Sequence, residues 1–107
     1  MKEVPRVSIE DILNNVDKYL NKKVEVQGTL VLLGKSPRGI TYSINLPESE
    51  DYCIAMLRSK EAAILCYGLE GLPFEEYNEK EVRVIGIVIK MHETIAIKIT
   101  EIKKLNE

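Results

Sequence analysis

The sequence predicts a mainly β fold in which five strands form a small barrel, and three observations lead to it. First, YLNKKVEVQGTL at residues 19–30 returns without gaps as YNEKEVRVIGIV at residues 77–88. Second, both copies alternate valines with the period of a strand that has one inward face, and their shared glycine allows a long strand to bend. Third, 107 residues with 45% hydrophobic content suit one domain with a single core. We therefore expect one domain over residues 1–107, with an arm at residues 1–18 and a barrel at residues 19–102.

The N-terminal arm is expected to be helical. Ser8 can cap a short helix that Asn14 and Asn15 would end, and the acidic residues Glu10 and Asp11 suit its first turn. The apolar residues of the arm recur at helical spacing and would pack it against the barrel: Ile9, Ile12, Leu13 and Val16.

The five strands are expected at residues 23–33, 40–46, 52–58, 81–90 and 94–102, because each segment alternates or is apolar throughout. GKSPRG at residues 34–39 and PESED at residues 47–51 contain the residues of turns and loops.

Residues 59–68, SKEAAILCYG, are rich in helix formers and end in glycine, which predicts a short helix between strands three and four. We expect residues 69–78 to be irregular, with Leu72 and Phe74 plugging one end of the core, and residues 103–107 to fray.

Composition limits the function. A net charge of -2 and a pI near 5.5 argue against a strongly basic nucleic-acid binder. The charge is uneven, because residues 47–81 hold nine acids and three bases, which leaves a basic surplus elsewhere. Neither a signal peptide nor a membrane span is evident, so we expect a cytoplasmic chain without a membrane partner. Abundant Ile, Lys and Glu with one Gln favour a thermophile.

Catalysis is not expected. Cys53 and Cys66 lie in apolar segments without a CxxC motif, which favours buried thiols over a disulfide. His92 is the single histidine and falls in a turn, where a solvated residue is the simplest interpretation. Phosphate loops, dinucleotide motifs and metal-ligand spacings are all missing from the sequence. We therefore expect a protein that is not an enzyme and has no cofactor or metal.

The element order resembles that of OB-fold domains of the nucleic-acid-binding, tRNA-anticodon-like class. Their opening strands often read Gly/Asn-Lys-x-Val-x-Val-x-Gly, as NKKVEVQG does here, and the resemblance covers residues 19–102. It implies a five-stranded, partly open Greek-key barrel. A small α+β domain, in which the matching strands are neighbours in an antiparallel sheet, is the alternative.

In such a barrel a ligand would lie across strands two and three, between the loops GKSPRG and KMHE. Bases in these loops would contact phosphates, polar residues would form hydrogen bonds, and Tyr52 would either stack on a base or pack in the sheet. The candidate nucleic-acid-binding residues are Lys35, Arg38, Thr41, Ser43, Tyr52, Arg58, Lys90 and His92.

Three functions are consistent with these patterns. The first is weak binding of single-stranded DNA or RNA. The second is a protein–protein interaction or assembly module, in which the acidic segment 47–81 and the apolar edge of strand three face a partner or a second copy. The third, a barrel for a small molecule or lipid, is disfavoured because Val, Ile and Leu would fill the interior.

Overall fold

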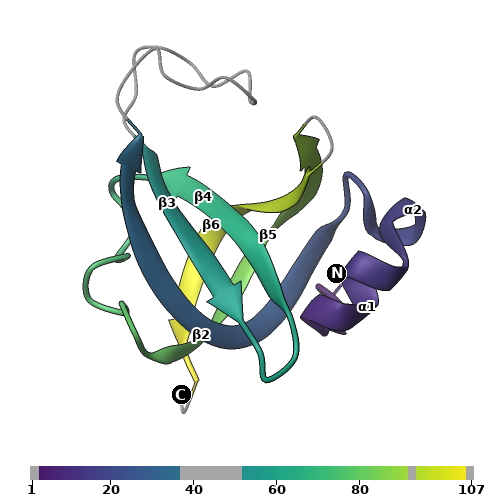
Figure 1. Cartoon of the computed structure of the whole chain (residues 1–107), viewed down its shortest axis with the longest axis horizontal. Coiled ribbons are helices and arrows are strands. Elements are labelled where there is room, and N and C mark those ends of the chain that lie inside the picture. Colours follow the sequence, from purple (N-terminus) through teal and green to yellow (C-terminus); the bar gives the residue numbers. More distant parts are fainter. Residues whose placement is uncertain (1–2, 37–51, 92–93, 106–107) are drawn as a thin grey trace.

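A computed structural model of the chain describes residues 3–36, 52–91 and 94–105. Two short helices and six strands follow one another along these residues (Figure 1). They are β1 (Arg6–Val7), α1 (Ile9–Asn14), α2 (Val16–Tyr19), β2 (Lys23–Ser36), β3 (Tyr52–Arg58), β4 (Ala63–Leu69), β5 (Glu81–Met91) and β6 (Thr94–Lys104).

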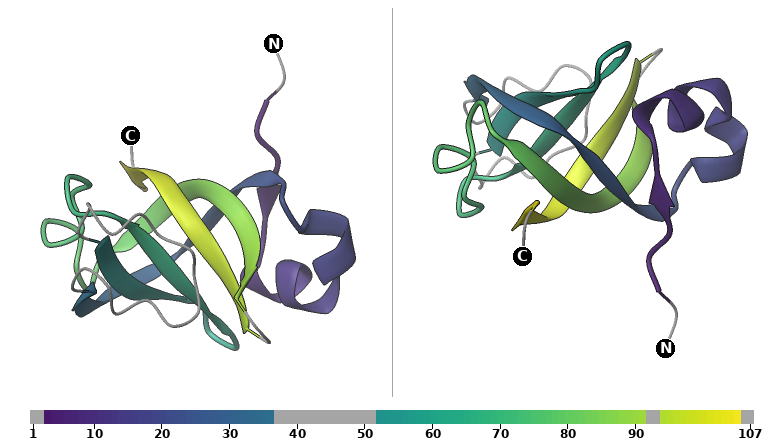
Figure 2. Two further views of the ribbon diagram at one scale, coloured as in Figure 1. Left: turned by 90° about the horizontal axis from the view of Figure 1, so that it is seen from above. Right: turned by 90° about the horizontal axis from the view of Figure 1, so that it is seen from below.

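Five of the strands close into a barrel. The order is β2-β3-β4-β6-β5, and β5 pairs with β2 to complete the circle (Figure 2). The β4–β6 pair is parallel and the other four pairs of the barrel are antiparallel, while β1 adds a short parallel pair to β2. The predicted mainly β, five-stranded barrel with an N-terminal helix is therefore confirmed. The matching strands are indeed neighbours, as in the α+β alternative, but the sheet closes.

The repeated sequence has a structural counterpart in the register of β2 and β5. Val26 of the first copy pairs with Val84, the equivalent residue of the second copy. Gly28 likewise pairs with Val82, and Gly86 pairs with Val24. Because equivalent residues meet in an antiparallel pair, an approximate two-fold axis passes between Val26 and Val84.

The repeated glycine is required by the close approach of a neighbouring strand. A Cβ atom on Gly28 would lie 2.7 Å from the carbonyl oxygen of Arg58 in β3, and one on Gly86 would lie 2.3 Å from the carbonyl oxygen of Lys98 in β6. In each copy the glycine therefore faces the backbone of a basic residue on the adjoining strand. The expected bend is present because only glycine leaves room for this approach.

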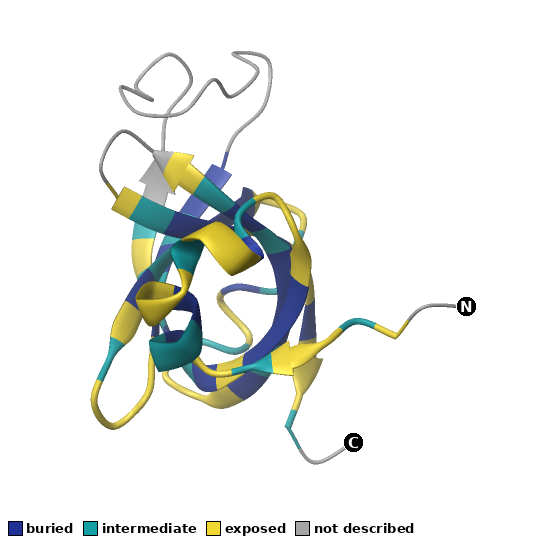
Figure 3. Ribbon diagram, turned by 90° about the vertical axis from the view of Figure 1, so that its right-hand side faces the viewer, coloured by how far each residue is buried: buried dark blue, intermediate teal, exposed yellow. Residues whose placement is uncertain are grey.

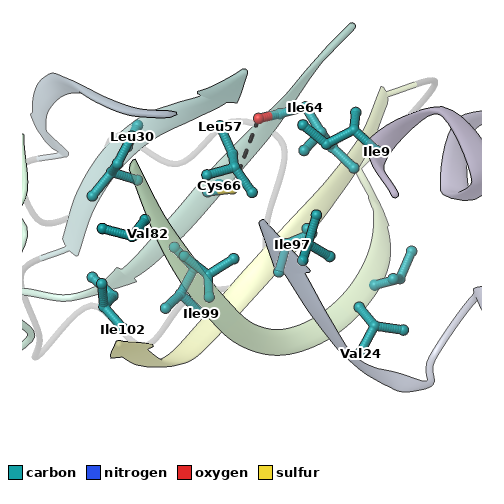
Figure 4. Close-up of a cluster of buried hydrophobic side chains, with 14 of the residues drawn as sticks. Ile9, Val24, Leu30, Leu57, Ile64, Cys66, Val82, Ile97, Ile99 and Ile102 are labelled. Carbon is teal, nitrogen blue, oxygen red and sulfur yellow. Dashed lines mark hydrogen bonds between the residues drawn. The ribbon is translucent and has the colours of Figure 1, made fainter. Parts of the chain in front are cut away.

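Side chains fill the barrel interior, as predicted (Figure 4). Ile9 and Ile12 of α1 are fully buried, and α1 covers one end of the barrel (Figure 3). Phe74 is buried in the same core. It belongs to the turns between β4 and β5, and this segment lies on the side of the barrel away from the helices (Figure 1). The strands contribute Val24, Val26, Leu30, Cys53, Ala55, Leu57, Ile64, Cys66, Val82, Val84, Val88, Ile97, Ile99 and Ile102.

The predicted helix at residues 59–68 is wrong. Residues 59–62 form a turn in which Ser59 N donates to Ala62 O at 2.8 Å, and residues 63–69 form β4, the third strand of the barrel. Ile64 and Cys66 point inward while Leu65 and Tyr67 point outward, so pairing with β3 and β6 overrides the helix propensity of the segment. The predicted strand at residues 40–46 lies outside the described residues.

Other elements agree more closely with the expectations. Ser8 caps α1, with Asp11 N donating to Ser8 Oγ at 2.9 Å, and the segment between β4 and β5 is irregular. β2 extends to Ser36 and therefore includes the first residues of the predicted loop. β6 extends to Lys104, which pairs with Val82. Residues 103 and 104, which were expected to fray, are therefore part of the strand. No helix within the described ranges is long and apolar enough to cross a membrane.

Candidate nucleic-acid interface

The outward side chains of β3, β4 and β6 form one continuous surface, which we call the outer face. Their inward neighbours belong to the barrel core, and side chains alternate along a strand, so every second residue points outward. Over β3, β4 and residues 94–100 of β6, the outer face consists of Tyr52, Ile54, Met56, Arg58, Ala63, Leu65, Tyr67, Leu69, Thr94, Ala96, Lys98 and Thr100.

Strand register places these residues in rows across the outer face. One row joins Met56, Leu65 and Ala96, and the next joins Ile54, Tyr67 and Lys98. Only two of the twelve residues are charged: Arg58 at the end of β3 and Lys98 on β6, both exposed. The outer face thus combines an apolar centre with two cations. Farther along β6, Glu101 and Lys103 point outward on either side of the buried Ile102, and they form an ion pair with 4.0 Å between Lys103 Nζ and Glu101 Oε1.

Tyr52 and Tyr67 form a small second cluster on the outer face with Ala96. Tyr52 is only 3% exposed, and its ring meets that of Tyr67 edge-on, with 6.1 Å between the ring centroids. Tyr52 therefore packs in the sheet, which was one of its two predicted roles. Its ring offers no surface on which a base could stack. Tyr52 shares the outer face with Arg58, as alternation along β3 requires, but its side chain is buried.

Burial raises the pKa of Tyr67 from 10.0 to about 12, and the nearby Tyr52 adds to this effect. A raised pKa means that folding favours the neutral phenol. The neutral Tyr67 phenol therefore contributes to the stability of the folded state. We expect this contribution to be complete below pH 10 and to disappear as the pH rises through about 12. Unfolding midpoints measured from pH 9 to 12 should fall more steeply for the natural protein than for the Tyr67→Phe variant. Equal slopes would contradict the burial of this hydroxyl group.

Of the other predicted site residues, the structure describes three and leaves four outside the described residues. Arg58 is exposed on the outer face, and Lys90 is exposed near the end of β5, where it pairs with Ile95. The backbone of Lys35 pairs with Cys53 in the β2–β3 ladder. The remaining predicted site residues lie outside the described residues: Arg38, Thr41, Ser43 and His92.

Sequence reasoning missed several members of the outer face. Leu65 and Tyr67 were hidden because their segment was assigned to a helix. Lys98 had an available signal, because the sequence places it between two isoleucines, Ile97 and Ile99, and both of them lie in the core. Alternation alone could therefore have placed Lys98 on the outer face.

The described residues offer little for catalysis. Burial raises the pKa of the Cys66 thiol to about 12, which leaves it protonated and a poor nucleophile at neutral pH. Cys53 is buried as well, and the two are not joined by a disulfide. In the part of the chain that the structure describes, no group of three or more His, Cys, Asp or Glu side chains could hold a metal ion.

Comparison with known proteins gives a likeness in structure alone. No protein-family model matches the sequence, and no curated protein matches it. Among solved structures, the chain is similar to a protein from Leishmania major Friedlin assigned as an aspartyl-tRNA synthetase, with a TM-score of 0.62 and 16% sequence identity. The match covers 100% of this chain and 22% of the other, so the chain spans about a fifth of that protein. Together, the strand order of the closed barrel and this likeness show that the chain has an OB-fold.

Proposed function

We propose that the chain is a cytoplasmic, non-catalytic OB-fold module that binds single-stranded nucleic acid weakly through the outer face. The observation that carries this proposal is the charge of that face. Although the chain has a net charge of -2, the twelve residues of the outer face include two bases, Arg58 and Lys98, and the acid that follows them on β6, Glu101, is paired with Lys103. A phosphate backbone needs such cations and is repelled by acids, which these twelve residues do not include.

The position of the outer face in the barrel supports the same ligand. OB-folds bind oligonucleotides across their second and third strands, between the loop after strand one and the loop after strand four. Here the second and third barrel strands are β3 and β4, and the corresponding loops are residues 37–51 and 92–93. The Leishmania protein is named for a tRNA-dependent activity, which makes RNA the first ligand to test.

The chemistry of the outer face indicates the type of contact. Arg58 and Lys98 would bind phosphates, while the half-buried Ile54, Met56 and Leu65 would contact bases or sugars without reading their sequence. For a single strand, two phosphate contacts give a slope of about -1.4 when the logarithm of the binding constant is plotted against the logarithm of the salt concentration. Binding should therefore be weak and of low sequence specificity.

Arg58→Gln and Lys98→Gln test this proposal. Each should weaken binding of a single-stranded RNA to a similar degree for different sequences, and each should reduce the salt slope by about 0.7. Fluorescence anisotropy across a range of salt concentrations measures both quantities. Lys22→Gln is the matched control, because Lys22 is an exposed lysine in the turn before β2 and lies off the outer face. Undetectable binding at low salt, or a double variant with the natural slope, would refute the proposal.

A protein-interaction module is the second candidate, favoured by the apolar character of the barrel exterior. Leu69 on the outer face is 45% exposed, and Leu33 on β2 is 58% exposed. Light scattering separates the two candidates, because a stable dimer that does not bind oligonucleotides would favour protein association.

A further inference from the structure

A hollow of about 670 Å³ lies on the barrel wall beside the outer face. Its floor is formed by residues of β2 and β5, one side by β1 with the start of α1, and the other by the end of β3 with the turn that follows. A volume of this size is within the roughly 300–1,000 Å³ of small-molecule sites. The lining residues that matter below are Glu25, Gln27, Thr29, Arg58, Lys60 and Glu81.

The hollow exists because β2 changes partner along one edge. β1 pairs with β2 at Glu25 and Val26, whereas β3 begins to pair with β2 only at Thr29. Gln27 and Gly28 lie between these two partners, so neither β1 nor β3 pairs with β2 at these two residues. The opening is thus a consequence of the strand topology.

Acids and bases both line the hollow, but two of the three acids are engaged. Glu25, which is 8% exposed, has Oε2 at 2.8 Å from Arg6 Nε, and Glu10 Oε1 accepts a hydrogen bond from Ser59 Oγ at 3.0 Å. Glu81 is the third acid and is exposed. Arg58 and Lys60 lie together on one side, are exposed, and form no ion pair with any residue that the structure describes.

We propose that this hollow binds a phosphate-bearing ligand of nucleotide size. The Arg58 guanidinium can hold two phosphate oxygens in its fork, and the Lys60 ammonium supplies a second charge beside it. Gln27 and Thr29 on the floor offer an amide and a hydroxyl for the hydroxyl groups of a sugar. The ligand is either a free nucleotide or one nucleotide of a longer strand. The site shares Arg58 with the outer face, but Lys60, Gln27 and Thr29 lie outside that face and belong to the hollow alone.

An amide NMR titration with adenosine monophosphate tests the site directly. The nucleotide should shift the amides of residues 27–29 and 58–60, whereas adenosine without phosphate should shift them little. Lys60→Gln should weaken nucleotide binding about tenfold, the usual value of one charged hydrogen bond, and Lys22→Gln should leave it unchanged. Lys60 is an exposed turn residue outside the core, so its loss should not impair folding.

A parallel titration with single-stranded RNA identifies the source of the nucleotide. If Lys60→Gln weakens both ligands, the hollow receives part of a strand; if it weakens only adenosine monophosphate, the hollow receives a free nucleotide. Retained nucleotide binding without RNA binding would refute the outer-face function and support the hollow. The hollow is refuted if adenosine monophosphate causes no shifts at millimolar concentration, if it shifts only Ile54, Tyr67 and Lys98, or if Lys60→Gln binds it normally.

Discussion

Replacing Gly86 with alanine is expected to destabilise the barrel by about 3 kcal/mol, the upper end of the usual cost of overpacking. The new methyl group would lie 2.3 Å from the carbonyl oxygen of Lys98 and 2.9 Å from its carbonyl carbon. These are backbone atoms of β6, and β5 pairs with β6 from Val82 to Met91 with a register shift between Ile85 and Gly86, so they cannot rotate away as a side chain would. Gly28→Ala should cost less, because the nearest backbone atom, Arg58 O, is 2.7 Å away.

Denaturant unfolding of the two variants measures this difference, with Gly71→Ala as the matched control. A Cβ atom on Gly71 would meet nothing within 4 Å, so this variant should remain within about 0.5 kcal/mol of the natural protein. If Gly86→Ala unfolds at the same denaturant concentration as Gly71→Ala, the close approach of β5 and β6 is incorrect.

The same two glycines explain why so much of the fold could be predicted. A glycine recurring within two copies of one strand pattern is informative because a closed barrel must bring neighbouring strands close at its bends. The alternation around Gly28 and Gly86 was enough to locate β2 and β5. The apolar run after the polar segment PESED located β3, alternation of isoleucines located β6, and Ser8 with its acidic first turn located α1.

β4 could not be recognised for a physical reason. Period-two alternation is visible only when one face of a strand is polar, and both faces of β4 are apolar. Ile64 and Cys66 face the core, while Leu65 and Tyr67 belong to the outer face. Because the two faces do not differ in polarity, no strand pattern was visible. The helix-forming residues of this segment therefore led to the incorrect prediction of a helix.

Local pattern also limited the prediction of the candidate site. Arg58 was found because its direction follows from alternation within one strand. The burial of Tyr52 depends on Tyr67, which belongs to the strand that was missed. The hollow depends on Arg6 and Lys60, which are far apart in the sequence and approach only through the path of β2. Contacts of this kind follow from topology and have no signature in a short segment.

Phe74→Ala is expected to cost about 3–5 kcal/mol, a large share of the about 5–15 kcal/mol that stabilises a typical domain. Phe74 is 1% exposed and belongs to the barrel core, which it reaches from the turns between β4 and β5. Its truncation leaves a cavity that the barrel strands cannot close without breaking their pairing. Leu69→Ala is the control, because Leu69 is 45% exposed and its truncation should cost no more than about 1 kcal/mol.

A double-mutant cycle with Gly68 tests whether Phe74 occupies the position that the structure gives it. A Cβ atom on Gly68 would lie 3.1 Å from Phe74 Cζ and 2.8 Å from Leu72 Cδ1, so Gly68→Ala alone should destabilise by crowding these side chains. In the Phe74→Ala background the crowding by Phe74 is gone, and the added methyl group also fills part of the cavity. Gly68→Ala should therefore cost at least about 0.5 kcal/mol less there, which is coupling between residues in contact. Additive costs for the two substitutions would mean that Phe74 does not lie over Gly68, and that another residue closes this end of the barrel.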